Sequence, residues 1–248
     1  MSPAAFDSLH THSPADAVTS APQLATAASL ASRDSGVARP ALSIGKRAFD
    51  QVFATIACVL AAPLFLAVAL FVRLSSPGPI VFRQRRLGLM GEPFTVLKFR
   101  TMRHGASEDR HREYVAGLVG VPSAAAGDRD VFKLTGDDRV TPGGLWLRRT
   151  SLDELPQFWN VLRGEMSVVG PRPPLEYEVE RYEAWQWDRL RVRPGLTGLW
   201  QVSGRNRHTY FDMVKLDLVY IREWSFLGDL RIIARTPWVM LSNSGKAA

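Results

Sequence analysis

The sequence has little cysteine and few histidines, and it contains none of the common nucleotide-binding loops. Cys58 is the only cysteine in 248 residues, which excludes an internal disulfide and fits a reducing compartment or a membrane segment. The five histidines are scattered, and no Cys/His spacing predicts a metal site. A Walker A loop and a GxGxxG fingerprint are also missing. Disulfide-framed secreted domains and P-loop enzymes are therefore excluded, and a histidine-based acid/base mechanism has little support.

Acidic residues are scarce in one stretch of the chain. Between Ala41 and Met102, eight basic residues stand against two acidic ones, so this stretch carries +6 of the formal net charge of +7. The basic residues are Lys46, Arg47, Arg73, Arg83, Arg85, Arg86, Lys98 and Arg100. Such a block suits anionic lipid headgroups, phosphate substrates or nucleic acid, and charge alone does not choose among them.

The first 40 residues lack any sustained hydrophobic periodicity. They are rich in Ala, Ser, Pro and Thr, which predicts a disordered tail over residues 1–40. A basic segment followed by an apolar one is missing, so this tail does not resemble a secretory signal.

A run without charges follows the tail. "VFATIACVLAAPLFLAVALFV" covers residues 52–72, and as a straight helix it would be about 31 Å long, enough to cross a bilayer. Pro63 interrupts this run and leaves two halves of about 15 Å, each too short to span alone. Both flanks are basic, which keeps both ends on the cytoplasmic side. We therefore favour a re-entrant helix over residues 41–75, with a spanning helix as the alternative.

The remaining pattern, residues 76–248, predicts a mostly helical domain with a small hairpin. Residues 80–82 and 93–102 are expected to pair through the turn at Gly88–Gly91. Helical patterns occur near 108–118 and at 152–163, 175–190 and 210–222. The segment "WSFLGDLRIIARTPWVML" is amphipathic and aromatic, which is typical of an interfacial helix or of an ordinary core helix.

The stretch "TSLDELPQFW" places two adjacent carboxylates, Asp153 and Glu154, at an expected helix start. One interpretation is a capping box, with Ser151 as N-cap and Glu154 as its N3 partner. The other interpretation is a reacting centre, because neighbouring arginines favour the ionised carboxylate and screen the charge of a phosphate. In that case Asp153 is the nucleophile and Glu154 holds a divalent cation.

Basic residues elsewhere are candidates for phosphate or nucleotide binding. In "GPRPP", prolines on both sides of Arg172 aim one guanidinium from a stiff loop, although the same pattern also fits a surface turn. Lys98 and Arg100 alternate with apolar residues and share one strand face, which a solvated strand edge would explain equally. The glycine-containing segment 194–206 ends near Arg205, as in a loop that closes on a ligand.

Five motifs in this order resemble the bacterial sugar transferase family of small monotopic phosphoglycosyl transferases. The motifs are "SPGPIVFRQRRLG", "KFRTM", "LRRTSLDELPQFWNVLRGEMSVVGPRP", "RPGLTGLWQVSGRN" and "LDLVYIREWSFLGDL". They cover roughly residues 43–242, and the pattern is similar to the short enzymes that initiate exopolysaccharide synthesis. The resemblance implies an α+β, mostly helical fold seated on the cytoplasmic face of the bacterial inner membrane, with a Pro-broken re-entrant helix at Pro63.

The resemblance also implies the reaction and its residues. Asp153 attacks the β-phosphate of a UDP-sugar and expels UMP, and undecaprenyl phosphate then takes the sugar phosphate from the aspartyl intermediate. Glu154 is expected to bind Mg²⁺. Further expected binding residues are Lys98, Arg100, Arg148, Arg205 and Asp217, with the Pro171-Arg172-Pro173 segment at the uridine.

The expected partners are a UDP-sugar, undecaprenyl phosphate, an anionic membrane and downstream glycosyltransferases. Galactose and glucose are the candidate sugars. A non-enzymatic alternative is a basic, membrane-tethered scaffold of a polysaccharide assembly complex. A nucleic-acid module is disfavoured because the basic block flanks an apolar run instead of interleaving with exposed aromatics.

Overall fold

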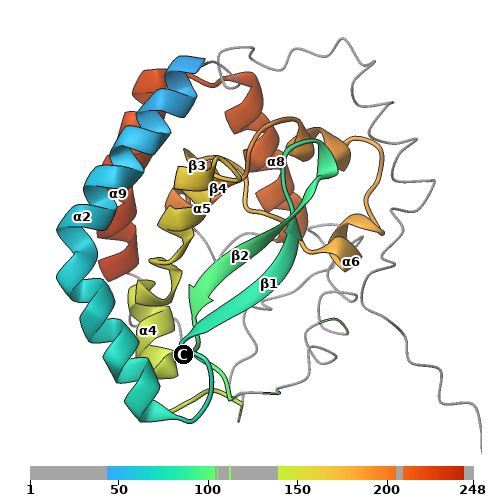
Figure 1. Ribbon diagram of the computed structural model, residues 1–248. Coiled ribbons are helices and arrows are strands. Elements are labelled where there is room, and N and C mark those ends of the chain that lie inside the picture. The colour runs from blue at the N-terminus through green and yellow to red at the C-terminus, as the bar shows by residue number, and fades with distance from the viewer. Residues whose placement is uncertain (1–43, 104, 106–111, 113–138, 205–208, 243–248) are drawn as a thin grey trace, which may run out of the picture.

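The computed structural model describes residues 44–103, 105, 112, 139–204 and 209–242 (Figure 1). The predicted tail at 1–40, most of the predicted helix near 108–118, and Arg205 lie outside the described residues.

The apolar run forms one long helix, α2 (Ile44–Ser75), which curves along one edge of the molecule (Figure 1). Pro63 lies inside the helix and cannot donate the backbone hydrogen bond of its turn, which is a recognised cause of bending. The sequence predicted a re-entrant helix broken at Pro63. The structure has one helix that continues through Pro63 instead of two separate segments, and the re-entrant topology stays a prediction. Among the described residues, α2 is the only helix long and apolar enough to cross a membrane.

The predicted hairpin is confirmed and is longer than expected. Strand β1 (Val81–Leu87) pairs antiparallel with β2 (Pro93–Phe99), and the short helix η2 (Leu89–Gly91) turns the chain between them. The strand therefore continues through the basic cluster at 83–86. Phe82 pairs with Lys98 and Arg86 pairs with Phe94. Because side chains alternate along a strand, Gln84, Arg86 and Lys98 share one face.

A series of short elements follows the hairpin in the chain. They are α4 (Gly144–Thr150), η4 (Leu152–Glu154), α5 (Gln157–Arg163), β3 (Ser167–Val169), α6 (Glu176–Val179), η5 (Gln186–Arg191), β4 (Gly195–Thr197) and α7 (Leu199–Val202). Strands β3 and β4 pair in parallel. The predicted helix at 175–190 forms only as α6 and η5, separated by a loop.

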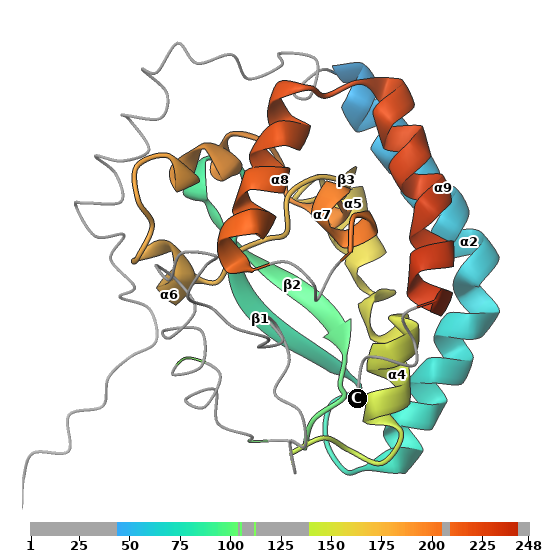
Figure 2. The ribbon, with the colours of Figure 1, turned by 180° about the vertical axis from the view of Figure 1, so that it is seen from behind.

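Two helices complete the described chain. Helix α8 (Tyr210–Arg222) has the predicted bounds, and Thr209 and Asp212 form a capping box at its start. Helix α9 (Phe226–Ser242) follows and runs beside α2, as Figures 1 and 2 both show. The rings of Phe49 and Phe226 are in edge contact, with centroids 4.9 Å apart.

The core joins these elements around the β3–β4 pair. Val161, Val168, Val169, Leu218 and Ile221 are buried in one cluster with Ala54 of α2. Asn160 of α5 is fully buried and bonds the hairpin edge, accepting from Leu97 N at 3.1 Å and donating to Thr95 O at 2.7 Å.

A buried ion cluster ties the start of α2 to α9. Lys46 Nζ lies 2.9 Å from a carboxylate oxygen of Asp50 and 2.9 Å from one of Asp229. Ser167 Oγ and Val168 N donate to Asp50, at 2.6 and 3.2 Å, so the cluster also fixes β3. Buried charges are tolerated where they are paired and hydrogen-bonded, as here.

Candidate active site

The two adjacent carboxylates lie on a single turn of 3₁₀ helix. Helix α4 ends at Thr150, and Ser151 adopts a left-handed conformation (φ 56°, ψ 19°) before η4 begins. Ser151 makes no side-chain cap hydrogen bond, so the predicted capping box is wrong. A left-handed backbone at a non-glycine residue is strained, and such strain concentrates at functional sites. The turn directs Asp153 inward, where it is 7% exposed.

Glu154 points to the hairpin instead of capping a helix. Its Oε1 accepts a hydrogen bond from Lys98 Nζ at 2.9 Å. Both side chains keep about a quarter of their surface exposed, 24% for Lys98 and 29% for Glu154. The structure therefore brings together the acidic pair and a lysine from a segment some 56 residues earlier in the chain. An ion pair at the surface of the site remains accessible to a charged ligand.

Two arginines occupy the last turn of α4, directly before the acidic pair. Arg148 Nε donates to Thr101 Oγ1 at 2.8 Å, which orients this guanidinium beside the end of β2. Arg149 Nε is buried and has no hydrogen-bond partner among the described residues. Buried donors normally have acceptors, so a bound anion would satisfy Arg149 Nε.

The predicted stiff loop follows β3. Gly170 and Gly195 pack so closely that a Cβ on Gly195 would lie 2.1 Å from Gly170 N, which only glycine avoids. Gly195 N donates to Pro171 O at 2.7 Å. The carbonyl of Arg172 accepts from Arg189 Nη2 at 3.1 Å. These contacts hold the loop by its backbone.

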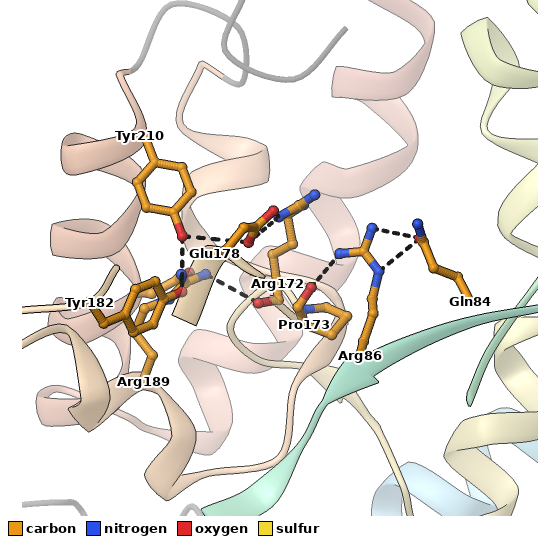
Figure 3. A network of polar contacts seen from close by, with 9 residues as sticks. Gln84, Arg86, Arg172, Pro173, Glu178, Tyr182, Arg189 and Tyr210 are labelled. Carbon is orange, nitrogen blue, oxygen red and sulfur yellow. Dashed lines mark hydrogen bonds and ion pairs between the residues drawn. The ribbon is translucent and has the colours of Figure 1, made fainter. Parts of the chain in front are cut away.

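Side chains fix the same loop from two directions (Figure 3). Arg172 Nη1 donates to both carboxylate oxygens of Glu178, at 3.2 and 3.3 Å. The Arg86 guanidinium, which comes from the hairpin, donates to the carbonyl of Pro173. Gln84 accepts from Arg86 Nε and Nη2, at 3.2 and 3.0 Å. The loop that carries Arg172 is thus clamped between the hairpin and α6.

Behind the loop lies a buried network that the sequence did not reveal. Arg189 donates to Tyr182 Oη at 2.6 Å and forms an ion pair with Asp217 at 2.7 Å. The hydroxyl groups of Tyr182 and Tyr210 lie 2.9 Å apart, and Tyr210 also donates to Glu178 (Figure 3). Only Asp217 was predicted. The other members are polar residues spread over distant segments, and no local spacing marks them.

Burial and opposite charge act on the carboxylates of this network. Burial alone would raise the pKa of Glu178, but the guanidiniums of Arg172, Arg86 and Arg189 together lower it. Burial raises the pKa of Asp217 to about 6, against the effect of Arg189. Asp217 pairs with Arg189, and Arg189 donates to the carbonyl of Arg172. Asp217 is therefore part of the support of the Arg172 loop.

The other predicted residues lie apart from the acidic pair. Arg100 is buried, and its guanidinium donates to the carbonyls of Ser76 and Pro77 at 2.6 and 2.8 Å, so it binds the end of α2. Pro63 lies in the exposed middle of α2, and Arg205 is outside the described residues. The predicted ligand role of Arg100 and Arg205 stays a prediction.

The described residues contain no group of three or more His, Cys, Asp or Glu side chains that could hold a metal ion. Mg²⁺, however, is commonly bound through one or two carboxylates together with substrate phosphates. Asp153 and Glu154 offer such a carboxylate pair, so the donor set fits Mg²⁺ only when a phosphate ligand is present.

The sequence also matches known proteins. A model described as bacterial sugar transferase matches residues 41–243. The exopolysaccharide production protein ExoY of Sinorhizobium fredii is 45% identical over 224 residues, which cover 90% of this chain and 97% of that protein. The ExoY protein of Rhizobium meliloti is 44% identical over 210 residues, 84% of this chain and 91% of the relative.

Relatives with more specific names are similar over most of this chain. The UDP-glucose:undecaprenyl-phosphate glucose-1-phosphate transferase of Caulobacter vibrioides is 43% identical over 80% of this chain and 70% of its own length. The undecaprenyl-phosphate galactose phosphotransferase of Salmonella typhimurium is 40% identical over 81% of this chain but only 41% of its own length. The segment that matches the family model, residues 41–243, contains the site described above.

Proposed function

Because the chain belongs to the bacterial sugar transferase family, we propose that it transfers a hexose 1-phosphate from a UDP-sugar to undecaprenyl phosphate. The relatives named above include a glucose-1-phosphate and a galactose phosphotransferase, so glucose and galactose are the candidate sugars. The ExoY relatives are exopolysaccharide production proteins of nearly the same extent, which supports a role at the start of exopolysaccharide synthesis.

The observation that carries the proposal is the position of Asp153, a buried carboxylate with charged groups on both sides of it in the site. This carboxylate is buried on a strained turn, between the arginines at the end of α4 and the Lys98–Glu154 ion pair. Cations around a phosphate reduce its charge and lower the barrier to attack by an anionic nucleophile. A fixed carboxylate has also lost most of the freedom that a productive attack would otherwise cost.

In the first step, an oxygen of Asp153 attacks the β-phosphorus of the UDP-sugar. The bond from this phosphorus to the bridging oxygen breaks, UMP leaves with that oxygen, and an aspartyl phosphosugar remains. In the second step, a phosphate oxygen of undecaprenyl phosphate attacks the same phosphorus. The aspartyl bond breaks, Asp153 regains its carboxylate, and the polyprenyl diphosphosugar is released.

The supporting roles follow from position and charge. Lys98 pairs with Glu154, and Arg148 and Arg149 lie in the last turn of α4 just before the acidic pair. These three cations would contact the diphosphate, while the clamped Arg172 would orient the nucleotide. Glu154, together with Asp153, would hold Mg²⁺ against the phosphates. When bound, Mg²⁺ neutralises phosphate charge and polarises the P–O bonds.

We further propose that α2 is re-entrant and that the site faces the cytoplasm. Both ends of α2 are bound to the same folded body, through Lys46 at the start and through the bonds of Arg100 to Ser76 and Pro77 at the end. The middle is exposed and apolar, with Leu60 75% and Leu66 73% exposed. A bilayer between the two ends would separate contacts that the fold makes together. In a Cys58→Ser background, cysteines placed at Gly45 and Ser76 are expected to react with an impermeant thiol reagent from the same side of the membrane. Labelling from opposite sides would favour a spanning helix.

The reaction is tested by intact-protein mass after incubation with Mg²⁺ and a panel of UDP-sugars, without polyprenyl phosphate. We expect a gain of one hexose phosphate with the true donor, loss of this adduct when undecaprenyl phosphate is added, and release of UMP. Asp153→Asn is expected to abolish the adduct and to leave membrane binding intact. Glu180→Gln is the matched control, since it makes the same carboxylate-to-amide change at an exposed residue.

The combination of signals separates the competing explanations. UMP release without an adduct in the wild-type protein would point to rapid hydrolysis of the intermediate, which quenching at early times would reveal. An adduct that persists in Asp153→Asn would assign the nucleophile to another residue. Absence of both adduct and UMP with every donor would contradict the enzymatic proposal and favour the scaffold alternative.

A further inference from the structure

The buried network behind the loop that carries Arg172 contains more guanidinium groups than carboxylates. Three guanidiniums, those of Arg86, Arg172 and Arg189, stand against the two carboxylates of Glu178 and Asp217. Arg172 pairs with Glu178 and Arg189 pairs with Asp217. Arg86 forms no ion pair with any described residue. A buried cation without a counter-charge is costly, and such groups are usually paired.

The hydrogen bonds of Arg86 leave part of its guanidinium unused. The group has five N–H donors, and three of them are engaged, two with Gln84 Oε1 and one with the Pro173 carbonyl. One N–H on each terminal nitrogen has no acceptor among the described residues. Two neighbouring donors on one guanidinium match the oxygens of a phosphate or carboxylate group.

The surroundings of the Arg86 guanidinium favour the binding of an anion. Arg86 is 7% exposed, and burial together with the charge of Arg172 lowers its pKa to about 10. Lowering of this kind shows that the cation is disfavoured in the protein as it stands. Figure 3 shows the Arg86 guanidinium with Gln84 on one side and with Arg172 and the Pro173 carbonyl on the opposite side.

Arg86 also lies on the hairpin face that carries the lysine partner of the acidic pair. It shares one face of the hairpin with Lys98, which pairs with Glu154. The charge of Glu178, and to a smaller extent that of Glu154, attracts the Arg86 guanidinium. A nucleotide bound against Arg172, with its diphosphate directed to Asp153, would pass over this face of the hairpin. Arg86, which forms no ion pair of its own among the described residues, lies where the diphosphate would supply a partner charge.

We propose that Arg86 is a substrate-binding residue that pairs with the diphosphate of the nucleotide sugar. This inference rests on the proposed function, since it assigns the donor's phosphates to a particular cation. It separates the roles of two guanidiniums: Arg172, which pairs with Glu178, orients the nucleotide, and Arg86 carries the charge that the ligand neutralises.

The test measures ligand binding in an Asp153→Asn background, which prevents turnover. Dissociation constants for UDP-glucose, UDP-galactose, UMP and uridine are compared for the parent, Arg86→Gln, Arg86→Lys and Arg85→Gln. Arg85 is the adjacent control, since it lies on the other face of the strand and makes an exposed ion pair with Glu176 at 3.2 Å. Thermal unfolding without ligand reports whether each variant folds.

For Arg86→Gln we expect a roughly 10- to 100-fold weaker affinity for the preferred UDP-sugar, as for loss of a charge-assisted hydrogen bond. Uridine has no phosphate, so its affinity is expected to change less than about threefold, which is within the context variation of a single neutral contact. Arg86→Lys keeps the positive charge but loses the planar guanidinium with its paired donors, so its affinity is expected to lie between those of the parent and Arg86→Gln. Arg85→Gln is expected to bind like the parent.

The outcomes distinguish this inference from the function on which it rests. If the parent binds none of the phosphate-containing ligands, the proposed donor is wrong. If the parent binds them and Arg86→Gln binds equally well, the role of Arg86 is refuted. Equal losses for uridine and the UDP-sugar would also refute it, because they would show that Arg86 only supports the loop. If Arg86→Gln does not fold, the dissociation constants of the phosphate-containing ligands and of uridine are compared in Arg86→Lys instead, with the same criteria.

Discussion

Replacing Lys46 with methionine removes the single cation that two buried carboxylates share. Lys46 Nζ is 2.9 Å from Asp50 and from Asp229, and the three side chains are at most 6% exposed. Methionine has a similar length, so packing changes little while both negative charges lose their partner. Removing one member of a buried ion pair costs about 3–5 kcal/mol, because the remaining charge stays uncompensated.

The hydrogen bonds that remain place the expected cost at the lower end of this range. Each carboxylate keeps two further donors, among them Ser167 Oγ at 2.6 Å for Asp50 and Tyr220 Oη at 2.9 Å for Asp229. We therefore expect a loss of about 3 kcal/mol in the free energy of unfolding. For a chain of this size, this corresponds to a decrease in Tm of about 6–12 °C.

The assay is thermal unfolding in detergent micelles, followed by tryptophan fluorescence. Arg47→Met is the matched control, because it makes the same kind of change at the next residue, whose side chain is exposed. Lys46→Met/Asp229→Asn is expected to recover part of the lost stability, since it removes one of the two orphaned charges. A decrease in Tm of less than about 2 °C, or one equal to that of Arg47→Met, would refute the reasoning.

The pH dependence of this variant provides a second check. Burial raises the pKa of Asp229, whereas Lys46 opposes the effect, so removing Lys46 raises this pKa further. A carboxyl group whose pKa is raised by folding contributes stability at low pH that is lost as the pH rises. The deficit of Lys46→Met relative to the wild type should therefore be smaller at pH 5 than at pH 8. A larger deficit at pH 5 would contradict the assignment.

Three further predictions concern the site and its support. Lys98→Met removes the partner of Glu154 and should lower kcat/KM about 10- to 100-fold with little change in Tm; normal activity in a UMP-release assay would contradict this. Asn160→Ala leaves hairpin groups unpaired and should cost about 2 kcal/mol in denaturant unfolding, whereas an unchanged midpoint would show that water replaces them. Because the pKa of Glu178 is lowered, its contribution is present above the unfolded pKa near 4.5 and is lost below it. Glu178→Gln should thus lose less stability than the wild type on going from pH 5.5 to 3.5, and parallel losses would argue against the shift.

Elements with a strong local signal were predictable from the sequence. The hairpin follows from its turn glycines and its alternating side chains, although the basic residues at 83–86 obscured the length of β1. Helix α8 was predicted with its observed bounds because its residues repeat with helical spacing. In both cases the residues that specify the element are close together in the chain.

The prediction failed where buried polar groups organise the chain. Residues 175–190 were expected to form one helix, but Glu178 and Arg189 turn inward to ion partners and the segment folds as two short pieces. The residue types of Ser151 and Glu154 match the capping-box pattern, but the Glu154 carboxylate forms an ion pair with Lys98 instead. Long-range ion pairs leave no periodic signal, so a single sequence does not reveal them.

The same distinction explains which part of the site could be read in advance. Asp153, Glu154 and Lys98 stood out because carboxylates and cations occur in recognisable motifs. The cation of Arg86 did not, because its importance depends on a charge count over segments that only the fold brings together. A left-handed Ser151 then completes the arrangement. If this residue were helical, α4 would continue through the acidic pair, and Asp153 and Glu154 would project about 100° apart on it. The strained turn instead buries one carboxylate and presents the other to the hairpin, so the two adjacent residues acquire different partners.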